Sequence, residues 1–271
     1  MSTGYIDVGG GRLWYEEAGR GPSLLLLHAA GADSRMWDAQ WLPFASQFHA
    51  VRLDFPGAGR SPYPESPWNS SEHLVQVLDE LGMDRAAIVG VSMGGSAGID
   101  FVIEQPERAW ALVAAAAAPR GLENVIPNPR AFEVYTLLMA GRLSRAAELF
   151  VDLWCPLRTS PEIDARIRAM VRDNIGMLAQ VPQGLVRTPE WAASDRLGEI
   201  AVPTLAIWGD RDERNIRAGA ARLAAEVPGA RALELPNVDH FVPMRAPEVF
   251  TREALTFLEA AAPERGAATR G

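Results

Sequence analysis

The sequence predicts an α/β protein: a mostly parallel sheet with helices on both faces and a helical insertion. Short apolar runs alternate along the chain with helical patterns, and the first two extended runs are joined by a glycine turn. Continuous apolar runs are typical of strands buried on both faces, and their alternation with helices favours a parallel sheet. From Pro119 to about Arg196 this alternation stops.

The strands follow from their branched, apolar composition. An N-terminal hairpin is expected within residues 5–19, and further strands at 23–28, 50–54, 86–91, 110–118, 203–210 and 230–236. Apolar residues at helical spacing predict helices at 36–48, 70–82 and 247–261, the second with a serine cap and a terminal glycine.

The stretch without strands has helical patterns at 129–141, 143–154 and 161–178. We therefore predict a core domain formed by 1–119 and 196–271, and a helical cap or lid formed by 120–195. Such an insertion would lie over the carboxyl ends of the strands, where ligands bind in open α/β sheets.

Composition excludes several classes of function. A net charge of −8 over 271 residues argues against a nucleic-acid partner. The longest apolar run, 110–118, is too short to span a bilayer, and no basic and apolar leader opens the chain, so we expect a cytoplasmic protein without a membrane partner. Cys155 is the single cysteine, which excludes an intrachain disulfide, and its apolar neighbours favour a buried thiol. Disorder is expected only at the tail, 262–271.

The run from Gly90 to Gly94 has the pattern G-x-S-x-G, with Ser92 at its centre. A branched apolar strand precedes it and a helix start rich in glycine and alanine follows it. This is the setting of a nucleophile elbow, in which a strained turn exposes the serine hydroxyl. The alternative is that the glycines only allow close packing of helix against strand.

A serine hydroxyl needs a base to take its proton, and histidine suits that task near neutral pH. Of the four histidines, His240 follows the last strand and precedes the final helix, at the edge of the sheet where Ser92 is expected. His73 lies in a helix expected to be solvated, and His49 precedes a strand, so both are expected to be structural. His28 ends a strand and is expected to hold the following loop.

The imidazole in turn needs an acceptor on its second nitrogen. Asp212 is favoured because it lies three residues past Gly209, the end of a strand, and Asp210 is the competing candidate. Asp239 adjoins His240 in the chain and is poorly placed to bond its neighbour's ring, so we expect a supporting or capping role for it.

Attack on a carbonyl forms an oxyanion, which requires fixed backbone donors. The N–H groups of Met93, at a helix start, and of Ala30, in the loop after an early strand, are expected to supply them. Trp37, Trp154 and Met244 are expected to contact an apolar substrate, although all three are equally consistent with core positions.

Four ordered motifs resemble the α/β-hydrolase superfamily over nearly the whole chain: the oxyanion loop at 24–41, the turn at 52–62, the elbow at 89–95 and the histidine loop at 239–250. Within it, the chain looks closest to bacterial carboxylesterases and to enol-lactone hydrolases such as 3-oxoadipate enol-lactonase. The resemblance implies a substrate-selecting cap and no cofactor or metal. It departs from the family at Ala29 and Asp239, where glycines are usual.

We expect a serine hydrolase that cleaves a small-molecule carboxylic ester or lactone through Ser92, Asp212 and His240 and an acyl-enzyme. Two alternatives stay open: a carbon-carbon bond hydrolase or perhydrolase with the same triad, and a slow-turnover ligand receptor on a hydrolase scaffold. A serine at the elbow argues against epoxide hydrolases and haloalkane dehalogenases of this fold, which use aspartate there. The sequence indicates neither the physiological substrate nor the oligomeric state.

Overall fold

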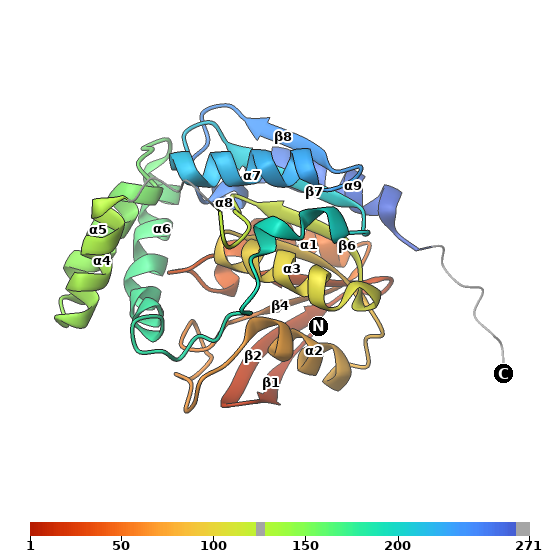
Figure 1. The fold of residues 1–271 in the computed structure, drawn as a ribbon, viewed down its shortest axis with the longest axis horizontal. Coiled ribbons are helices and arrows are strands. Elements are labelled where there is room, and N and C mark those ends of the chain that lie inside the picture. The colour runs from red at the N-terminus through yellow and green to blue at the C-terminus, as the bar shows by residue number, and fades with distance from the viewer. Residues whose placement is uncertain (123–127, 264–271) are drawn as a thin grey trace.

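The computed structural model describes residues 1–122 and 128–263 and confirms the predicted fold class. An eight-stranded sheet has the order β1-β2-β4-β3-β5-β6-β7-β8 (Figure 1). β1 and β2 pair antiparallel, as do β2 and β4, and all other neighbours are parallel. The strands are β1 (Ser2–Val8), β2 (Gly11–Ala18), β3 (Ser23–Leu27), β4 (His49–Leu53), β5 (Ala86–Val91), β6 (Ala109–Ala115), β7 (Thr204–Gly209) and β8 (Arg231–Leu235).

Side chains alternate between the two faces of the sheet, as the twofold period of a strand requires. In β3, Leu24 and Leu26 belong to one hydrophobic cluster, and Leu25 and Leu27 belong to the other. All four are fully buried, because helices cover both faces. This explains why the strand is a continuous apolar run in the sequence.

The helices divide between the two faces. The first cluster includes residues of α1 (Asp38–Ala45) and α9 (Pro247–Ala261). The second includes residues of α2 (Ser70–Glu80), α3 (Met93–Glu104) and α7 (Arg214–Glu226). None of these helices, nor any other in the described part of the chain, is long and apolar enough to cross a membrane.

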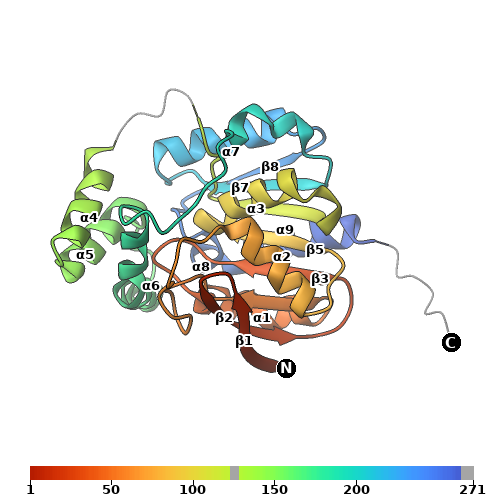
Figure 2. The ribbon, with the colours of Figure 1, turned by 60° about the horizontal axis from the view of Figure 1, so that its bottom comes forward.

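Three helices form a separate layer between β6 and β7 in the chain. They are α4 (Pro129–Met139), α5 (Leu143–Trp154) and α6 (Pro161–Asn174). Figures 1 and 2 both show them gathered at one end of the sheet. We call these helices and their connections the cap.

Two local expectations were wrong. The N-cap of α2 is Asn69, whose side chain accepts a hydrogen bond from the Glu72 N–H, and not a serine. His73 does not face solvent: it is 2% exposed, stacks on Trp68 and bonds the carbonyl oxygen of Gly9. The tail expected to be disordered lies, from residue 264 on, outside the described residues.

The buried histidines give stability a defined pH dependence. Burial lowers the pKa of both His28 and His73 below the usual 6.5. Below that pH the unfolded chain takes up protons that the folded chain does not, so the free energy of unfolding should fall as pH falls through about 6.5. Urea denaturation at pH 7.5, 6.5 and 5.5 measures this decline.

The variant His73→Gln keeps a donor for Gly9 and removes one titrating group. It should lose less stability than the unsubstituted protein over the same pH range, while His28 still contributes. An unchanged pH dependence in this variant would contradict the assignment to His73.

Candidate active site

Ser92 occupies the turn between β5 and α3 in a strained backbone conformation, with φ 51° and ψ −113°. Non-glycine residues with positive φ are uncommon, and such strain persists only where the surrounding structure enforces it. Here the Ser92 N–H donates to the Ala115 carbonyl of β6 at 2.8 Å, and the Ser92 carbonyl accepts from the Ser96 N–H at 2.7 Å. The sheet and the helix thus hold the serine between them.

The glycines around Ser92 are required by close packing. A Cβ on Gly90 would lie 2.3 Å from the Gly94 carbonyl oxygen, and one on Gly94 would lie 2.4 Å from the Leu27 carbonyl oxygen. A Cβ on Gly95 would lie 2.5 Å from the Cβ of Ala117. Close packing of helix against strand and a serine held at the turn are therefore two consequences of the same backbone geometry, not alternatives.

His240 lies between Ser92 and Asp212. Its Nε2 is 2.7 Å from the Ser92 Oγ, and its Nδ1 is 2.9 and 3.0 Å from the two carboxylate oxygens of Asp212. The side chains of His240 and Asp212 are 2% and 0% exposed. The structure thus brings together the three residues selected from the sequence.

The loops that carry Asp212 and His240 pair with each other. The Asp210 N–H donates to the Leu235 carbonyl, and the Arg211 N–H donates to the Val238 carbonyl, both at 3.0 Å. The Asp210 carboxylate accepts from the Asn237 N–H at 2.6 Å. Asp210, the competing candidate, therefore shapes the turn, while Asp212 reaches the imidazole.

The expected oxyanion peptide is oriented by His28. Its Nδ1 donates to the Ala29 carbonyl at 2.8 Å, and its Nε2 accepts from the Phe55 N–H at 2.9 Å. The Ala32 N–H also donates to the Ala29 carbonyl. Because the peptide is trans, the N–H of Ala30 points away from these contacts. Burial lowers the pKa of His28, which agrees with a neutral ring that donates from one nitrogen and accepts at the other.

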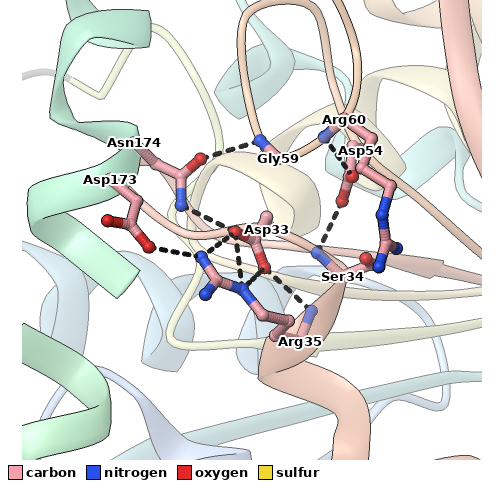
Figure 3. Close-up of a pocket in the computed structure, with 8 residues that line it drawn as sticks. All are labelled: Asp33, Ser34, Arg35, Asp54, Gly59, Arg60, Asp173 and Asn174. Carbon is pink, nitrogen blue, oxygen red and sulfur yellow. Dashed lines mark hydrogen bonds and ion pairs between the residues drawn. The ribbon is translucent and has the colours of Figure 1, made fainter. Parts of the chain in front are cut away.

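Residues 33–35, at the far end of the same loop, line a polar cleft of about 370 Å³ and are held there by side-chain hydrogen bonds (Figure 3). The Asp54 carboxylate accepts from the Ser34 N–H at 2.7 Å. Asp33 pairs with Arg35 and accepts from the Asn174 side chain of α6 at 2.7 Å. None of Ser92, Asp212 and His240 lines this cleft. Its residues bond the oxyanion loop to the cap.

The helix α5 covers the site from the cap side. A Cβ on Gly31, next to Ala30, would meet the Phe150 ring at 3.5 Å. The Phe150 and Trp154 ring centroids are 4.6 Å apart, and that of Trp154 is 6.5 Å from that of His240. The His240 N–H also donates to the Trp154 carbonyl at 3.2 Å.

The three residues expected to contact substrate lie in different surroundings. Trp154 is partly buried beside His240. Trp37 is fully buried against Phe250 of α9, and Met244 is 5% exposed in the same hydrophobic cluster. Trp37 and Met244 therefore occupy core positions, which is the alternative that the sequence left open for them.

A cavity of about 150 Å³ lies beside Met93. Its lining is mainly apolar and includes Phe55, Trp68, Ala97 and Val186. The cavity lies between the first turn of α3 and residues 181–189, which lead from the cap back to the core. Within residues 1–122 and 128–263, no three His, Cys, Asp or Glu side chains converge to hold a metal ion.

Cys155 and Asp239 are both buried near the site. Burial and the neighbouring Asp239 raise the pKa of the Cys155 thiol well above its usual value, so a thiolate nucleophile is disfavoured. Asp239 bonds Arg245 and the backbone N–H of Leu157. Sequence reasoning gave Asp239 a supporting role but missed Arg245, which lies six residues further on.

The strained serine, the mostly parallel sheet and the buried imidazole together define a serine hydrolase of the α/β type. Residues 24–253 match the Alpha/beta hydrolase family, and the chain belongs to that family.

Relatives of this chain include 2-hydroxy-6-oxo-6-phenylhexa-2,4-dienoate hydrolase of Burkholderia cepacia, 26% identical over 91% of each chain. Carboxylesterase YbfK of Bacillus subtilis (strain 168) is 27% identical, over 88% of this chain and 80% of its own. The solved enol-lactonase from Burkholderia xenovorans LB400 has a TM-score of 0.83 and 24% identity, covering 94% of this chain and all of that one. The enol-lactonase supports the fold, and the two other relatives represent different hydrolase chemistries.

The packing at the elbow yields a stability prediction. Gly94→Ala should lower the free energy of unfolding by about 1–3 kcal/mol or more, because its Cβ would overlap the backbone of β3. Gly198→Ala is the matched control, since a Cβ there meets nothing within 4 Å. Urea denaturation of both variants measures the difference, and equal stabilities would contradict the packing argument.

Proposed function

We propose that this hydrolase cleaves a carboxylic ester or lactone through Ser92, His240 and Asp212. The observation that carries the proposal is the continuous hydrogen-bonded path from the Ser92 Oγ through the His240 ring to Asp212, with every step at 2.7–3.0 Å. These distances are those required between a nucleophile, its general base and the group that orients the base.

In the first half of the reaction, the Ser92 Oγ attacks the carbonyl carbon as His240 Nε2 takes the hydroxyl proton. The tetrahedral intermediate then collapses, His240 gives that proton to the leaving alkoxide, and an acyl-enzyme and an alcohol result. In a lactone the leaving alcohol stays attached to the acyl chain.

In the second half, His240 takes a proton from water, which attacks the acyl carbon. Ser92 leaves with that proton, and the acid is released. Asp212 accepts from Nδ1 throughout, which fixes the tautomer and stabilises the imidazolium formed in each half.

The oxyanion is assigned to the N–H groups of Met93 and Ala30. The Met93 N–H begins α3, where first-turn N–H groups lack intrahelical acceptors and the helix dipole favours negative charge. The Ala30 N–H is turned away from the carbonyl that His28 holds. Two fixed donors at this point are the requirement for stabilising a tetrahedral intermediate.

An apolar substituent on the substrate is supported by the surroundings of Ser92. Trp154 and Phe150 cover the site from the cap, and the cavity beside Met93 has mainly apolar lining. We assign substrate contact to Trp154 and the cavity to an aliphatic chain of the ester.

A second candidate, a carbon-carbon bond hydrolase, is favoured by the similarity to the dienoate hydrolase. A dienoate carries a carboxylate, whose burial would call for a cation. Arg245, a buried cation near His240, is already paired with Asp239 and Asp164. The two arginines that line the cavity beside Met93 are also paired, Arg120 with Asp100 and Arg187 with Glu72. Because these cations already have carboxylate partners, a neutral ester is favoured over the anionic substrate.

Variants of the triad test the assignment of roles. Ser92→Ala should abolish labelling by a fluorophosphonate and turnover of p-nitrophenyl butyrate. Asp212→Asn should lower kcat by roughly 10³- to 10⁴-fold, because it favours the wrong histidine tautomer. Asp210→Asn is the matched control and should keep kcat close to the unsubstituted value. Mass spectrometry that located the adduct on a residue other than Ser92 would overturn the assignment.

A substrate panel separates the two candidate reactions. p-Nitrophenyl esters of two to eight carbons should be hydrolysed, and 2-hydroxy-6-oxo-6-phenylhexa-2,4-dienoate should be cleaved far more slowly. Ala97→Leu, which would fill the cavity beside Met93, should lower kcat/KM for the longer esters relative to acetate. Faster cleavage of the dienoate than of every ester would favour the carbon-carbon hydrolase, and a uniform effect of Ala97→Leu would remove the cavity from the substrate site.

A further inference from the structure

A buried charged group adjoins the histidine loop and serves none of the steps above. Asp239 directly precedes His240, and its Oδ1 accepts from Arg245 Nε at 2.9 Å. Arg245 Nη1 donates to Asp164, near the start of α6 in the cap. The side chains of Asp239, Arg245 and Asp164 are 0%, 1% and 13% exposed.

Asp239 and Arg245 together hold one residue of the cap through its backbone. The Leu157 N–H donates to Asp239 Oδ2 at 3.0 Å, and the Leu157 carbonyl accepts from Arg245 Nη2 at 2.9 Å. Three residues earlier, the Trp154 carbonyl accepts the His240 N–H. The segment 154–164 is therefore bonded to the histidine loop at four of its residues: Trp154, Leu157, Thr159 and Asp164.

These contacts bury charged side chains, and removing a charge from water costs desolvation free energy. Burial raises the pKa of Asp239, and hydrogen bonding by Arg245 opposes that rise. Burial alone would lower the pKa of Arg245, but bonding to Asp239 and Asp164 outweighs it. A buried ion pair gives little net stability over a well-packed apolar pair, so stability does not account for the group. Its directed, forked geometry does supply orientation.

We propose that Asp239 and Arg245 are positioning residues that fix the cap segment 154–164 to the histidine loop. By doing so they hold His240 in line with Ser92, and they hold the Trp154 ring beside His240. The proposal rests on the proposed function, because it assigns a purpose to the alignment of that triad. Neither residue touches the reacting atoms: Asp239 acts through the peptide of His240, and Arg245 acts through Asp239 and Leu157.

The other end of α6 shows what is particular about this contact. Asn174 bonds Asp33 and the Gly59 N–H, so the helix reaches the oxyanion loop as well. There the charged partners Arg35 and Asp173 are 47% and 58% exposed and border an open cleft (Figure 3). At the oxyanion loop Asp33 is buried but its partner Arg35 is exposed, whereas at the histidine loop both members of the ion pair, Asp239 and Arg245, are buried, and the pair adjoins His240.

The test compares stability with turnover in the full-length protein. Asp239→Asn leaves Arg245 with Asp164 as its one carboxylate partner, and Arg245→Met leaves both Asp239 and Asp164 without the arginine. Both variants should lower the free energy of unfolding, and Arg245→Met should lower it more. The double variant Asp239→Asn/Arg245→Met removes both fully buried charges and leaves only Asp164, which is 13% exposed, without its partner, so it should be more stable than Arg245→Met. If the residues position His240, the double variant should still turn over p-nitrophenyl butyrate roughly ten- to a hundredfold more slowly, because the loop is no longer fixed.

Turnover is counted per competent site, by titrating Ser92 with a fluorophosphonate, so that loss of folded protein does not lower the apparent kcat. The expected change is in kcat, with KM for the butyrate ester held within about twofold. Arg245→Lys keeps the charge but not the fork and should give an intermediate kcat. Arg166→Gln is the control: it breaks a cap-to-core ion pair with Asp38 that is exposed, and it should leave kcat unchanged.

A double variant with recovered stability and unchanged kcat per titrated site would overturn the proposal and leave Asp239 and Arg245 as structural residues. An equal loss of kcat in Arg166→Gln would overturn it as well. Absence of a Ser92 adduct in the unsubstituted protein would instead refute the proposed function, so the two failures are distinguishable.

Discussion

The site depends on the strained backbone of Ser92. A positive φ at a serine costs about 1–3 kcal/mol, and the chain tolerates it only because both flanking elements are fixed. β5 lies inside the sheet between β3 and β6, and α3 packs so closely that Gly90, Gly94 and Gly95 leave no room for a Cβ. The close packing and the position of the Ser92 hydroxyl at the turn therefore arise from the same backbone geometry.

Three loops converge on that serine, and each is oriented by a side chain that bonds backbone. His28 holds the Ala29 carbonyl, Asp210 holds the Asn237 N–H and Asp239 holds the Leu157 N–H. The three loops follow β3, β7 and β8, whose carboxyl ends share one edge of the parallel sheet. The order of the parallel strands brings the loops to the same edge of the sheet, and these bonds then orient them.

Most of the architecture could be predicted from local patterns. The eight strands, the three cap helices and the choice of Asp212 over Asp210 follow from apolar runs, from helical spacing and from position relative to a strand end. The surroundings of His73 and Trp37 could not be predicted, because burial depends on which distant segment covers a side chain. Nothing in the sequence near His73 reveals Trp68 stacked on it, and nothing near Trp37 reveals Phe250.

Arg245 illustrates the same limit at the site. An arginine five residues after a histidine has no local signature of function, since its partners Asp164 and Leu157 come from the cap, more than eighty residues earlier in the sequence. Two of the contacts between the cap and the catalytic loops differ in kind: aromatic rings of α5 lie beside the histidine and the oxyanion loop, and a buried ion pair lies at the histidine loop. Aromatic surfaces adapt to different apolar ligands, whereas forked ion pairs allow one geometry. Under the proposed function, this division would let the aromatic contacts set which acyl groups fit, while the charged contacts keep the histidine in line with Ser92.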